Sequence, residues 1–406
     1  MHVIDTPVHI ALEEKYGAHN YHPLPVVLSR GSGVYVWDTD NKKYLDFLSG
    51  YSALNQGHCH PTIIEALTRQ AQQLTLTSRA FYNDKLGPYE QFACKYFGYD
   101  KLLPMNTGVE AVETAIKLCR KWAYHHKKIE ENRALVVVCE GNFHGRTSTV
   151  ISFSSDLDSK HQFGPYMPGF VSIPYNDIEA LTAALQNPHV AGFLVEPIQG
   201  EAGVVVPTEG YLRAAFEACK KANVLFIADE IQTGLGRTGA RLACDHEGVQ
   251  PDILILGKAL SGGTLPVSAV LADDEIMLVI QPGQHGSTYG GNPLSCAVAV
   301  ASITVLEEEN MAANALEMGI RFRKGIEQIK SPHIALVRGK GLMNAVVIEH
   351  SDKEAAWQLC IEMMNNGLLA KPTHGDKIRF APPLVISAAQ IEEALAIIEK
   401  SLAVLD

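Results

Sequence analysis

Apolar and polar positions form two distinct patterns along most of the chain. Short, continuously apolar runs predict buried strands at 134–139, 192–195, 225–228 and 253–256. Apolar positions at helical spacing predict helices at 61–74, 110–124, 178–185 and 211–222. Continuously apolar strands separated by helices are typical of parallel sheets that are covered on both faces. The pattern therefore predicts an α/β fold with a mostly parallel sheet between two layers of helices.

The two ends of the chain have a different pattern. Near the N-terminus, the stretch VYVWDTDNKKYLDF predicts a hairpin that turns at Thr39, Asp40 and Asn41. After about Pro293, helices are predicted at 294–309, 311–329, 353–366 and 388–405. Strands are predicted between them at 334–337, 345–348 and 378–380. This mixture of helices and strands is typical of an α+β unit.

These patterns predict three parts of the chain. Residues 1–49 form an N-terminal segment. Residues 50–293 form a large domain, and residues 294–406 form a small α+β domain. No segment has the composition of a flexible linker, and no internal repeat is visible, so we expect closely packed units.

Composition and charge narrow the classes of function. The 406 residues are 47% hydrophobic, and 34 basic against 45 acidic side chains give a net charge of −11. An acidic surface argues against nucleic-acid binding, and no apolar run is as long as a membrane span. The N-terminal stretch MHVIDTPVHIALEEKYG has neither a secretory nor a transit-peptide pattern. We therefore expect a cytoplasmic protein.

Eight cysteines are spread through the chain without a C-x-x-C pair. In a chain of this length they predict reduced, mostly buried thiols of an intracellular protein. The segment QGHCHP is similar to a metal-ligand cluster at first sight. However, His58, Cys59 and His60 are adjacent, and no second group of ligands follows at a suitable spacing. We expect no metal site.

The strongest candidate for chemistry is a pair of charged residues between positions 225 and 263. Asp229 ends the apolar run LFIAD, and Lys258 ends the run ILILGK, 258 − 229 = 29 residues later. Both runs predict parallel strands, so both side chains would emerge at strand ends, where open α/β sheets bind ligands. A salt bridge at the sheet edge is the simpler interpretation. The pair also suits pyridoxal 5′-phosphate (PLP), because the amine can form a Schiff base while the acid keeps the pyridine nitrogen protonated.

Two further segments could bind a phosphate group. Thr107 and Gly108 begin a predicted helix, where backbone N–H groups and the helix dipole favour an anion. An ordinary helix N-cap would explain the same residues. Ser287 and Thr288 lie in the glycine-rich stretch GQHGSTYGGNPLSC and could donate hydrogen bonds to a phosphate. A cluster of turn residues is the simpler interpretation of that stretch.

Two loops that follow predicted strands carry side chains suited to binding a substrate. In GNFHGRT, Phe143 could stack on a pyridine ring, His144 could fix nearby loops, and Arg146 could clamp a carboxylate through two hydrogen bonds. A structural ion pair would explain Arg146 equally well. In EPIQGEAGV, Glu201 is the better candidate for an active-site carboxylate, and we expect Glu196 to serve the structure.

Other common enzyme signatures are absent from the sequence. It contains no nucleophile elbow G-x-S-x-G, no Ser-His-Asp order and no phosphate loop G-x-x-x-x-G-K-[ST]. The commonest hydrolase and nucleotide-binding classes are therefore disfavoured.

Taken in order, these segments resemble the class III aminotransferases, which are PLP enzymes of fold type I. The resemblance runs from YGAHNYHPLPVVL to IRFAPPLVI and includes GYSALNQGHCHP, LTSRAFYND, PMNTGVEAVETA, GNFHGRT, EPIQGEAGVVVP and HGSTYGGNPL. It implies a large domain with a mostly parallel seven-stranded sheet between helices, and a smaller α+β domain built from the N- and C-terminal parts. It also implies PLP as the cofactor and a homodimer with shared active sites, with residues 1–49 contributing to the small domain and to the contacts between subunits.

The resemblance implies a role for individual residues at the cofactor. Lys258 would form the Schiff base and move protons, and Asp229 would pair with the pyridine nitrogen. Gln232 would hydrogen-bond the ring oxygen, and Phe143 would stack on the ring. Thr288 would reach the phosphate of the neighbouring subunit's cofactor. The other residues at the phosphate would be Thr107, Gly108, Val109 and Ser287.

For the substrates, the resemblance implies a switchable ion pair. Arg146 would bind the α-carboxylate of the amino donor, with Tyr21 alongside and Tyr51 lining the pocket. Glu201 would mask Arg379 and swing away when 2-oxoglutarate binds to it. L-Ornithine anchored on Arg146 would present its δ-amine to the cofactor, and the product would be glutamate 5-semialdehyde. The expected setting is arginine metabolism and proline biosynthesis.

Other interpretations stay open. N-acetylornithine or 4-aminobutyrate could be the amino donor, although the Tyr21 hydroxyl suits the polar α-end of free ornithine. A PLP-dependent epimerase or decarboxylase fits less well, because Glu201 and Arg379 suit a cycle with two substrates. A non-catalytic protein with this fold would be expected to have lost Lys258 or Asp229, and both are present.

Overall fold

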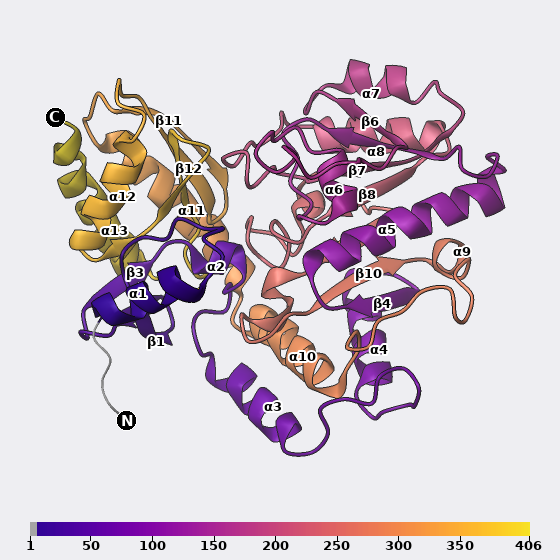
Figure 1. Ribbon diagram of the computed structural model, residues 1–406, viewed down its shortest axis with the longest axis horizontal. Coiled ribbons are helices and arrows are strands. Elements are labelled where there is room, and N and C mark those ends of the chain that lie inside the picture. Colours follow the sequence, from indigo (N-terminus) through magenta and orange to yellow (C-terminus); the bar gives the residue numbers. More distant parts are fainter. Residues whose placement is uncertain (1–5) are drawn as a thin grey trace.

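The computed structural model describes residues 6–406, so the first five residues of the predicted N-terminal segment lie outside it. Three sheets organise the described residues (Figure 1). The largest has seven strands in the order β4-β10-β9-β8-β7-β5-β6. Its strands are β4 (Lys101–Met105), β5 (Leu135–Cys139), β6 (Phe170–Ile173), β7 (Val190–Val195), β8 (Leu225–Asp229), β9 (Ile253–Leu256) and β10 (Ser268–Ala272).

The strands of this sheet are mostly parallel, as predicted. β9, β8, β7, β5 and β6 pair in parallel, whereas β10 is antiparallel to both of its neighbours, β9 and β4. Every residue of β7 and β8 is buried. Strands that are covered on both faces must be apolar on both faces, which explains the continuous apolar runs in the sequence.

Helices cover both faces of this sheet (Figure 1). α5 shares one buried cluster with Val136 of β5 and Ile227 of β8. α7 and α8 share another with Phe193 and Phe226, whose side chains lie on the opposite face. The helices around the sheet are α3 (Pro61–Ala71), α4 (Leu86–Phe97), α5 (Gly108–Trp122), α6 (Ser148–Ser152), α7 (Ile178–Ala184), α8 (Tyr211–Lys221), α9 (Asp274–Met277) and α10 (Pro293–Glu308).

The two smaller sheets combine the ends of the chain, which lie on the same side of the molecule in Figure 1. β1 (Leu28–Ser32), β2 (Tyr35–Asp38) and β3 (Lys43–Asp46) continue into β13 (Leu368–Leu369), which pairs in parallel with β3. β2 and β3 form the predicted hairpin. The other sheet is antiparallel, in the order β11-β12-β15-β14.

The remaining helices and strands are α1, which precedes β1, α2, which follows β3, and those of the C-terminal part. They are α1 (Thr6–Tyr16), α2 (Ser49–Ser52), β11 (Ile334–Lys340), β12 (Met343–Ile348), β14 (Lys371–Thr373), β15 (Lys377–Phe380), α11 (Met311–Gln328), α12 (Ala355–Asn365) and α13 (Ala388–Leu402). The predicted fold class, a large α/β part with a smaller α+β part built from both ends, is confirmed.

Some elements have no clear signal in the sequence. β4 contains Pro104, which is unusual inside a strand, and no residue of α1 is buried. Most cysteines are buried, as predicted, while Cys94 is half-buried and Cys59 is exposed. Within residues 6–406, no helix combines the length and the apolar character that crossing a bilayer requires.

Candidate active site

Asp229 and Lys258 lie at the carboxyl ends of two adjacent parallel strands. β8 ends at Asp229, which is aligned with Ile255 of β9, and Lys258 follows shortly after β9 ends. Lys258 has a φ of +44°, in the left-handed region that is costly for a residue with a side chain. Such strain persists only where the surrounding structure imposes it, and it is concentrated at functional sites.

His144 holds the carboxylate of Asp229. Its Nδ1 lies 2.7 Å from Asp229 Oδ2, and the backbone N–H of Ile231 donates to Asp229 Oδ1 at 3.1 Å. The two side chains are only 0% and 5% exposed. Burial disfavours the charged imidazole, but the hydrogen bond and the charge of Asp229 outweigh it and raise the pKa of His144. The pair fixes the orientation of the carboxylate at the sheet edge.

Lys258 is half-buried, and its amine lies among charged groups. Burial lowers the pKa of this amine, the charge of Glu201 partly opposes that effect, and the charge of Arg379 adds to it. A lowered pKa increases the fraction of neutral amine. A neutral amine is nucleophilic and can accept a proton, which are the two properties that covalent and proton-transfer chemistry require.

An ion pair between Glu201 and Arg379 lies close to Lys258. Glu201 Oε1 accepts hydrogen bonds from Arg379 Nη1 at 2.7 Å and from Gln232 Nε2 at 3.1 Å. Arg379 is 1% exposed, and within residues 6–406 its Nε has no hydrogen-bond partner. Burial would raise the pKa of Glu201, but Arg379, Lys258 and Gln232 together lower it. Glu201 is therefore a carboxylate that pairs with the guanidinium of Arg379 and masks it.

A cavity of about 670 Å³ contains both predicted substrate-binding arginines. Its lining includes Tyr51, Phe143, Arg146, Glu201 and Arg379. The guanidinium of Arg146 lies 5.5 Å from the centre of the Phe143 ring, and that of Arg379 lies 5.0 Å from the centre of the Tyr51 ring. Among residues 6–406, exposed Arg146 has no ion-pair partner, whereas buried Arg379 is paired. The cavity therefore offers one free and one masked site for a carboxylate.

The other predicted site residues lie outside the lining of this cavity. Tyr21 is 70% exposed, and Thr288 is exposed as well. Gln232 lies behind the cavity wall, where Arg379 Nη1 donates to its Oε1 at 3.2 Å. The full set outside the lining is Tyr21, Thr107, Gly108, Val109, Asp229, Gln232, Lys258, Ser287 and Thr288.

The start of α5 brings two of the predicted phosphate-binding segments together. Thr107 is the N-cap, and its side chain and that of Glu110 form a capping box. The side chain of Asn106, one residue earlier, donates to Ser287 Oγ at 2.8 Å. The hydroxyl of Ser268 donates to the carbonyl of Thr107 at 2.7 Å. Ser287 therefore lies beside the helix N-terminus, where backbone N–H groups favour an anion.

Tyr51 projects from a strained turn. Residues 49–52 all have left-handed φ values, at 50°, 55°, 61° and 68°, and only Gly50 among them is a glycine. Asp46 stabilises this turn, because its Oδ1 accepts the N–H groups of Leu48 and Ser49, each at 2.9 Å. Since a left-handed turn is costly for residues other than glycine, its occurrence beside the cavity suggests that it serves to aim Tyr51.

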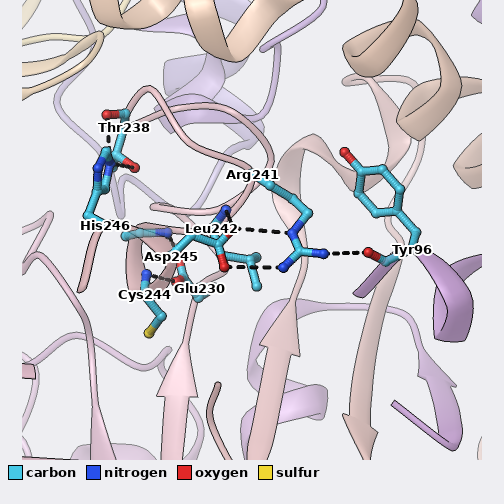
Figure 2. A network of polar contacts seen from close by, with 9 residues as sticks. Tyr96, Glu230, Thr238, Arg241, Leu242, Cys244, Asp245 and His246 are labelled. Carbon is cyan, nitrogen blue, oxygen red and sulfur yellow. Dashed lines mark hydrogen bonds and ion pairs between the residues drawn. The ribbon is translucent and has the colours of Figure 1, made fainter. Parts of the chain in front are cut away.

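Two buried glutamates support the loops of the site. Glu196 accepts the backbone N–H of Phe143 at 3.0 Å, and burial raises the pKa of Glu196 to about 7. Glu230 follows Asp229 directly and accepts the N–H groups of Ala243 and Cys244 at 3.0 and 2.8 Å. Figure 2 shows the contact with Cys244 within a network that also joins Arg241 to Asp245 and to the backbone of Tyr96. This network anchors the segment that follows Asp229.

Sequence reasoning missed part of the site. His144 was expected only to fix nearby loops, yet it is the direct partner of Asp229. Its position in GNFHGRT, directly after β5 in the sheet that also contains β8, was the available signal. Sequence reasoning gave no role to several other lining residues. Ser155, Asp156 and Asp158 come from a loop without a recognisable pattern, and Lys371 and Thr373 come from the short strand β14.

Comparison with known proteins identifies the family. Residues 16–402 match the family described as Aminotransferase class-III. Since the match covers most of the chain, the protein belongs to the class III aminotransferases, in agreement with the resemblance seen in the sequence.

Several relatives are similar over nearly the whole chain. The rat protein named "Ornithine aminotransferase, mitochondrial" is 60% identical over 96% of this chain and 89% of its own length. "Ornithine aminotransferase car2" of Schizosaccharomyces pombe is 55% identical over 96% of this chain and 92% of its own. Both relatives are named for the same activity.

Solved structures agree on the fold. The ornithine aminotransferase of Toxoplasma gondii superposes with a TM-score of 0.97 at 50% identity and covers 99% of this chain and 95% of that one. An acetylornithine aminotransferase of Elizabethkingia anophelis superposes with a TM-score of 0.91 at 57% identity, covering 98% and 99%. The same fold therefore occurs in proteins that are named for different amino donors.

The predicted cytoplasmic location is wrong. The relatives from rat, from two Drosophila species and from Caenorhabditis elegans are all named as mitochondrial proteins. The prediction rested on the absence of a targeting pattern, and location depends on targeting signals that receptors read. The lack of a leader pattern at the start of this sequence carries no information about location.

Proposed function

We propose that this protein transfers the δ-amino group of L-ornithine to 2-oxoglutarate, with PLP as the cofactor, and yields glutamate 5-semialdehyde and glutamate. The relatives named as ornithine aminotransferases, at 51–60% identity, support this activity. The observation that carries it is the presence of two arginines in different states in one cavity. Arg146 is free to bind an amino acid carboxylate, while Glu201 masks Arg379.

The residues near the end of β8 and β9 fit PLP. Bound PLP supplies an electron sink that makes the proton on the amine-bearing carbon acidic. Asp229, oriented by His144, suits the role of partner for the pyridine nitrogen. Phe143 suits a stacking contact with the ring. The residues available for the phosphate at the start of α5 are Thr107, Gly108, Val109 and Ser287, and Gln232 is available for the ring oxygen.

Lys258 would carry the proton transfers. Burial lowers the pKa of its amine, which increases the neutral fraction that can accept a proton. The neutral Nζ would take the proton from the amine-bearing carbon of the donor and deliver it to the carbon of the cofactor that receives the amino group, which is the proton shift that transamination requires. Lys258 is half-buried, which limits the access of water that would compete for this proton.

The Glu201–Arg379 pair would select the reacting amine. A donor whose α-carboxylate lay on Arg379 would present its α-amine, but Glu201 occupies that guanidinium. Ornithine is therefore left with Arg146, on which its α-carboxylate can rest beside Tyr51, with Tyr21 near the entrance. In the second half-reaction, 2-oxoglutarate brings its own carboxylate to Arg379 and replaces Glu201.

A homodimer with shared active sites is part of the proposal. Thr288 is exposed, and its neighbour Tyr289 is 59% exposed. Phe81 and Tyr82 are also largely exposed, at 75% and 105%. Exposed aromatic residues are typical of protein interfaces, so this surface would be covered by a second copy, whose cofactor phosphate Thr288 would reach. The expected metabolic setting is the conversion of ornithine toward proline.

The visible spectrum of the purified holoenzyme tests this function. Bound PLP gives an absorbance band that L-ornithine should bleach and 2-oxoglutarate should restore. A band that ignores ornithine but responds to N-acetylornithine or 4-aminobutyrate would keep the family and replace the substrate. The 57% identity to an acetylornithine aminotransferase makes N-acetylornithine the most informative alternative. No band after addition of PLP would contradict the assignment of Lys258.

A further inference from the structure

The loop between α9 and α10 carries Ser287 and Thr288, which the proposed function assigns to the cofactor phosphate. Ser287 Oγ accepts hydrogen bonds from the side chain of Asn106 at 2.8 Å and from the N–H of Gly290 at 3.0 Å. A serine hydroxyl has two lone pairs and one O–H group, so these contacts use both acceptor positions. The O–H group of Ser287 is left to donate, which suits a contact with a phosphate oxygen.

His285 joins this loop to α5. Its Nε2 lies 2.8 Å from Thr114 Oγ1, and its Nδ1 lies 2.8 Å from Lys117 Nζ. Thr114 is buried, and His285 is half-buried. Beside this contact, Lys121 Nζ donates to Gln284 Oε1. α5 is also the helix whose first residues are available for the phosphate, so these contacts align the loop with that site.

The partners of His285 require its neutral form. The Thr114 hydroxyl donates its only proton to the carbonyl of Glu110 at 2.7 Å, so its oxygen can only accept from His285. Nε2 of His285 must therefore carry a proton, and Nδ1 must accept a hydrogen bond from the ammonium group of Lys117. Protonation of the ring would turn Nδ1 into a donor that faces a second donor of the same charge. The contact with Lys117 would then be lost.

The charged groups around His285 do not favour the imidazolium. Lys117 and Lys121 are both cationic, and residues 278–292 contain no Asp, Glu, Lys or Arg. Burial and the charge of Lys117 lower the pKa of His285. The carboxylates of α5 and of α9, which packs on α5, contact other groups. Glu110 accepts the N–H groups of residues 106 and 107, Glu113 accepts the hydroxyl of Thr147, Asp274 pairs with Lys101, and Glu275 pairs with His126.

We propose that neutral His285 is a positioning residue that fixes the loop of Ser287 and Thr288 on α5 and so holds both hydroxyls in place for the cofactor phosphate. This inference rests on the proposed function, which assigns both residues to that phosphate. Protonation of His285 breaks the contact with Lys117 and loosens the loop. Retention of the cofactor therefore depends on the protonation state of a residue that acts through its neighbours in the loop.

Equilibrium dialysis of the full-length enzyme against PLP, at pH 8 and at pH 5, tests this role. In His285→Gln the amide can still donate to Thr114 and accept from Lys117, but it does not titrate, whereas His285→Ala removes both contacts. Between pH 8 and pH 5, the dissociation constant of PLP should rise about fivefold more for the wild type than for His285→Gln, as expected for the loss of one hydrogen bond. The phosphate of PLP and the amine of Lys258 titrate in both proteins, so their effects cancel. At pH 8, His285→Ala should bind PLP about fivefold more weakly than the wild type.

Two further variants separate this role from general effects. His333→Gln removes a half-buried histidine that contacts Asp406 in the C-terminal part, and it should keep the wild-type dependence on pH. In Lys117→Met, the pKa of His285, followed by NMR of the histidine ring, should rise toward its ordinary value because a neighbouring positive charge is gone.

Three results would overturn the proposed role of His285. They are an equal dependence on pH in the wild type and His285→Gln, wild-type affinity for PLP in His285→Ala at pH 8, and an unchanged pKa of His285 in Lys117→Met. Wild-type enzyme that bound no PLP at pH 8 would instead contradict the proposed function. The NMR titration would still decide whether Lys117 controls the protonation of His285, so the two failures are distinguishable.

Discussion

The buried and the outer parts of the active site differ in whether their charged groups have ion-pair partners. At the buried part, the charged groups neutralise one another, with Asp229 on His144 and Glu201 on Arg379, both at 2.7 Å. At the outer part, Arg146 and the lining residues Asp156 and Asp158 have no ion-pair partner within residues 6–406.

This difference follows from burial. An unpaired charge in the interior costs several kcal/mol, so inner groups must have partners before the substrate arrives. An exposed charge is solvated by water, so it can stay unpaired until a ligand binds at little cost in free energy. Changes in the buried part should therefore affect the chemistry or the stability, and changes in the outer part should affect the choice of substrate.

The largest expected effect is that of Lys258→Ala. Loss of a proton-transfer group typically lowers the rate by 10²–10⁴-fold, and here the cofactor would also lose its covalent anchor, so we expect a fall of about 10³-fold or more in kcat. Steady-state transamination of ornithine measures it. Lys127→Ala is a matched control, because burial also lowers the pKa of Lys127 but this lysine binds backbone carbonyls away from the cavity. Activity that survived in Lys258→Ala would rule out the assigned role.

Arg146→Ala should have the next largest effect, and it should depend on the donor. A charge-assisted pair with a carboxylate is worth about 1.5–3 kcal/mol, so kcat/KM for L-ornithine should fall roughly 10- to 100-fold. 1,4-Diaminobutane, which has no carboxylate, should react at an unchanged rate. Arg133→Ala, an exposed arginine outside the cavity, is the control. An equal loss for both donors would show that Arg146 supports the fold and not the substrate.

Glu201→Ala should change which amine reacts. Removing the carboxylate leaves Arg379 open, so the ratio of α- to δ-transamination should rise by roughly tenfold, the effect of about 1.4 kcal/mol. The products of ornithine distinguish the two reactions, because δ-transfer yields glutamate 5-semialdehyde, which cyclises to 1-pyrroline-5-carboxylate, whereas α-transfer yields 5-amino-2-oxopentanoate, which cyclises to 1-pyrroline-2-carboxylate. Glu201→Asp keeps the charge and should stay closer to the wild-type ratio. No change in the ratio for Glu201→Ala would remove the masking role.

The sequence predicted the buried part of the site better than the outer part, for a physical reason. Asp229 and Lys258 each follow an apolar run that predicts a buried strand. Because the carboxyl ends of parallel strands lie at the same edge of a sheet, the proximity of these two residues could be inferred from the sequence. Asp156 and Asp158 lie in a loop whose shape depends on hydroxyl contacts from Ser154 and Ser159. No periodicity encodes such contacts.

The same distinction applies to the fold. Strands such as β8 are buried on both faces and are visible as apolar runs. β10 is also buried throughout, but its antiparallel pairing with β9 and β4 is a property of the whole sheet and not of its own five residues. His144 shows the limit within the site, because its distance to Asp229 depends on how two strands are ordered in the sheet.

The smallest expected effect concerns stability and pH, at Glu196→Gln. Burial raises the pKa of Glu196 from 4.5 to about 7, so the folded protein prefers the protonated acid. A raised pKa contributes stability that is fully present below about pH 4.5 and is lost as the pH rises through about 7. The loss is at most about 3 kcal/mol, from 1.36 kcal/mol per pKa unit. Glutamine resembles the protonated acid and keeps an acceptor for the N–H of Phe143.

The variant should therefore gain in Tm relative to the wild-type holoenzyme at pH 8, by a few degrees at most, and should match it near pH 5. Thermal melts at both pH values measure the difference. Glu179→Gln, which removes an exposed carboxylate from α7, should show no such dependence on pH. A variant that is less stable than the wild type at pH 8 would mean that Glu196 is ionised and paired in the folded protein. The rule that buried charges of this site have partners would then extend to Glu196 as well.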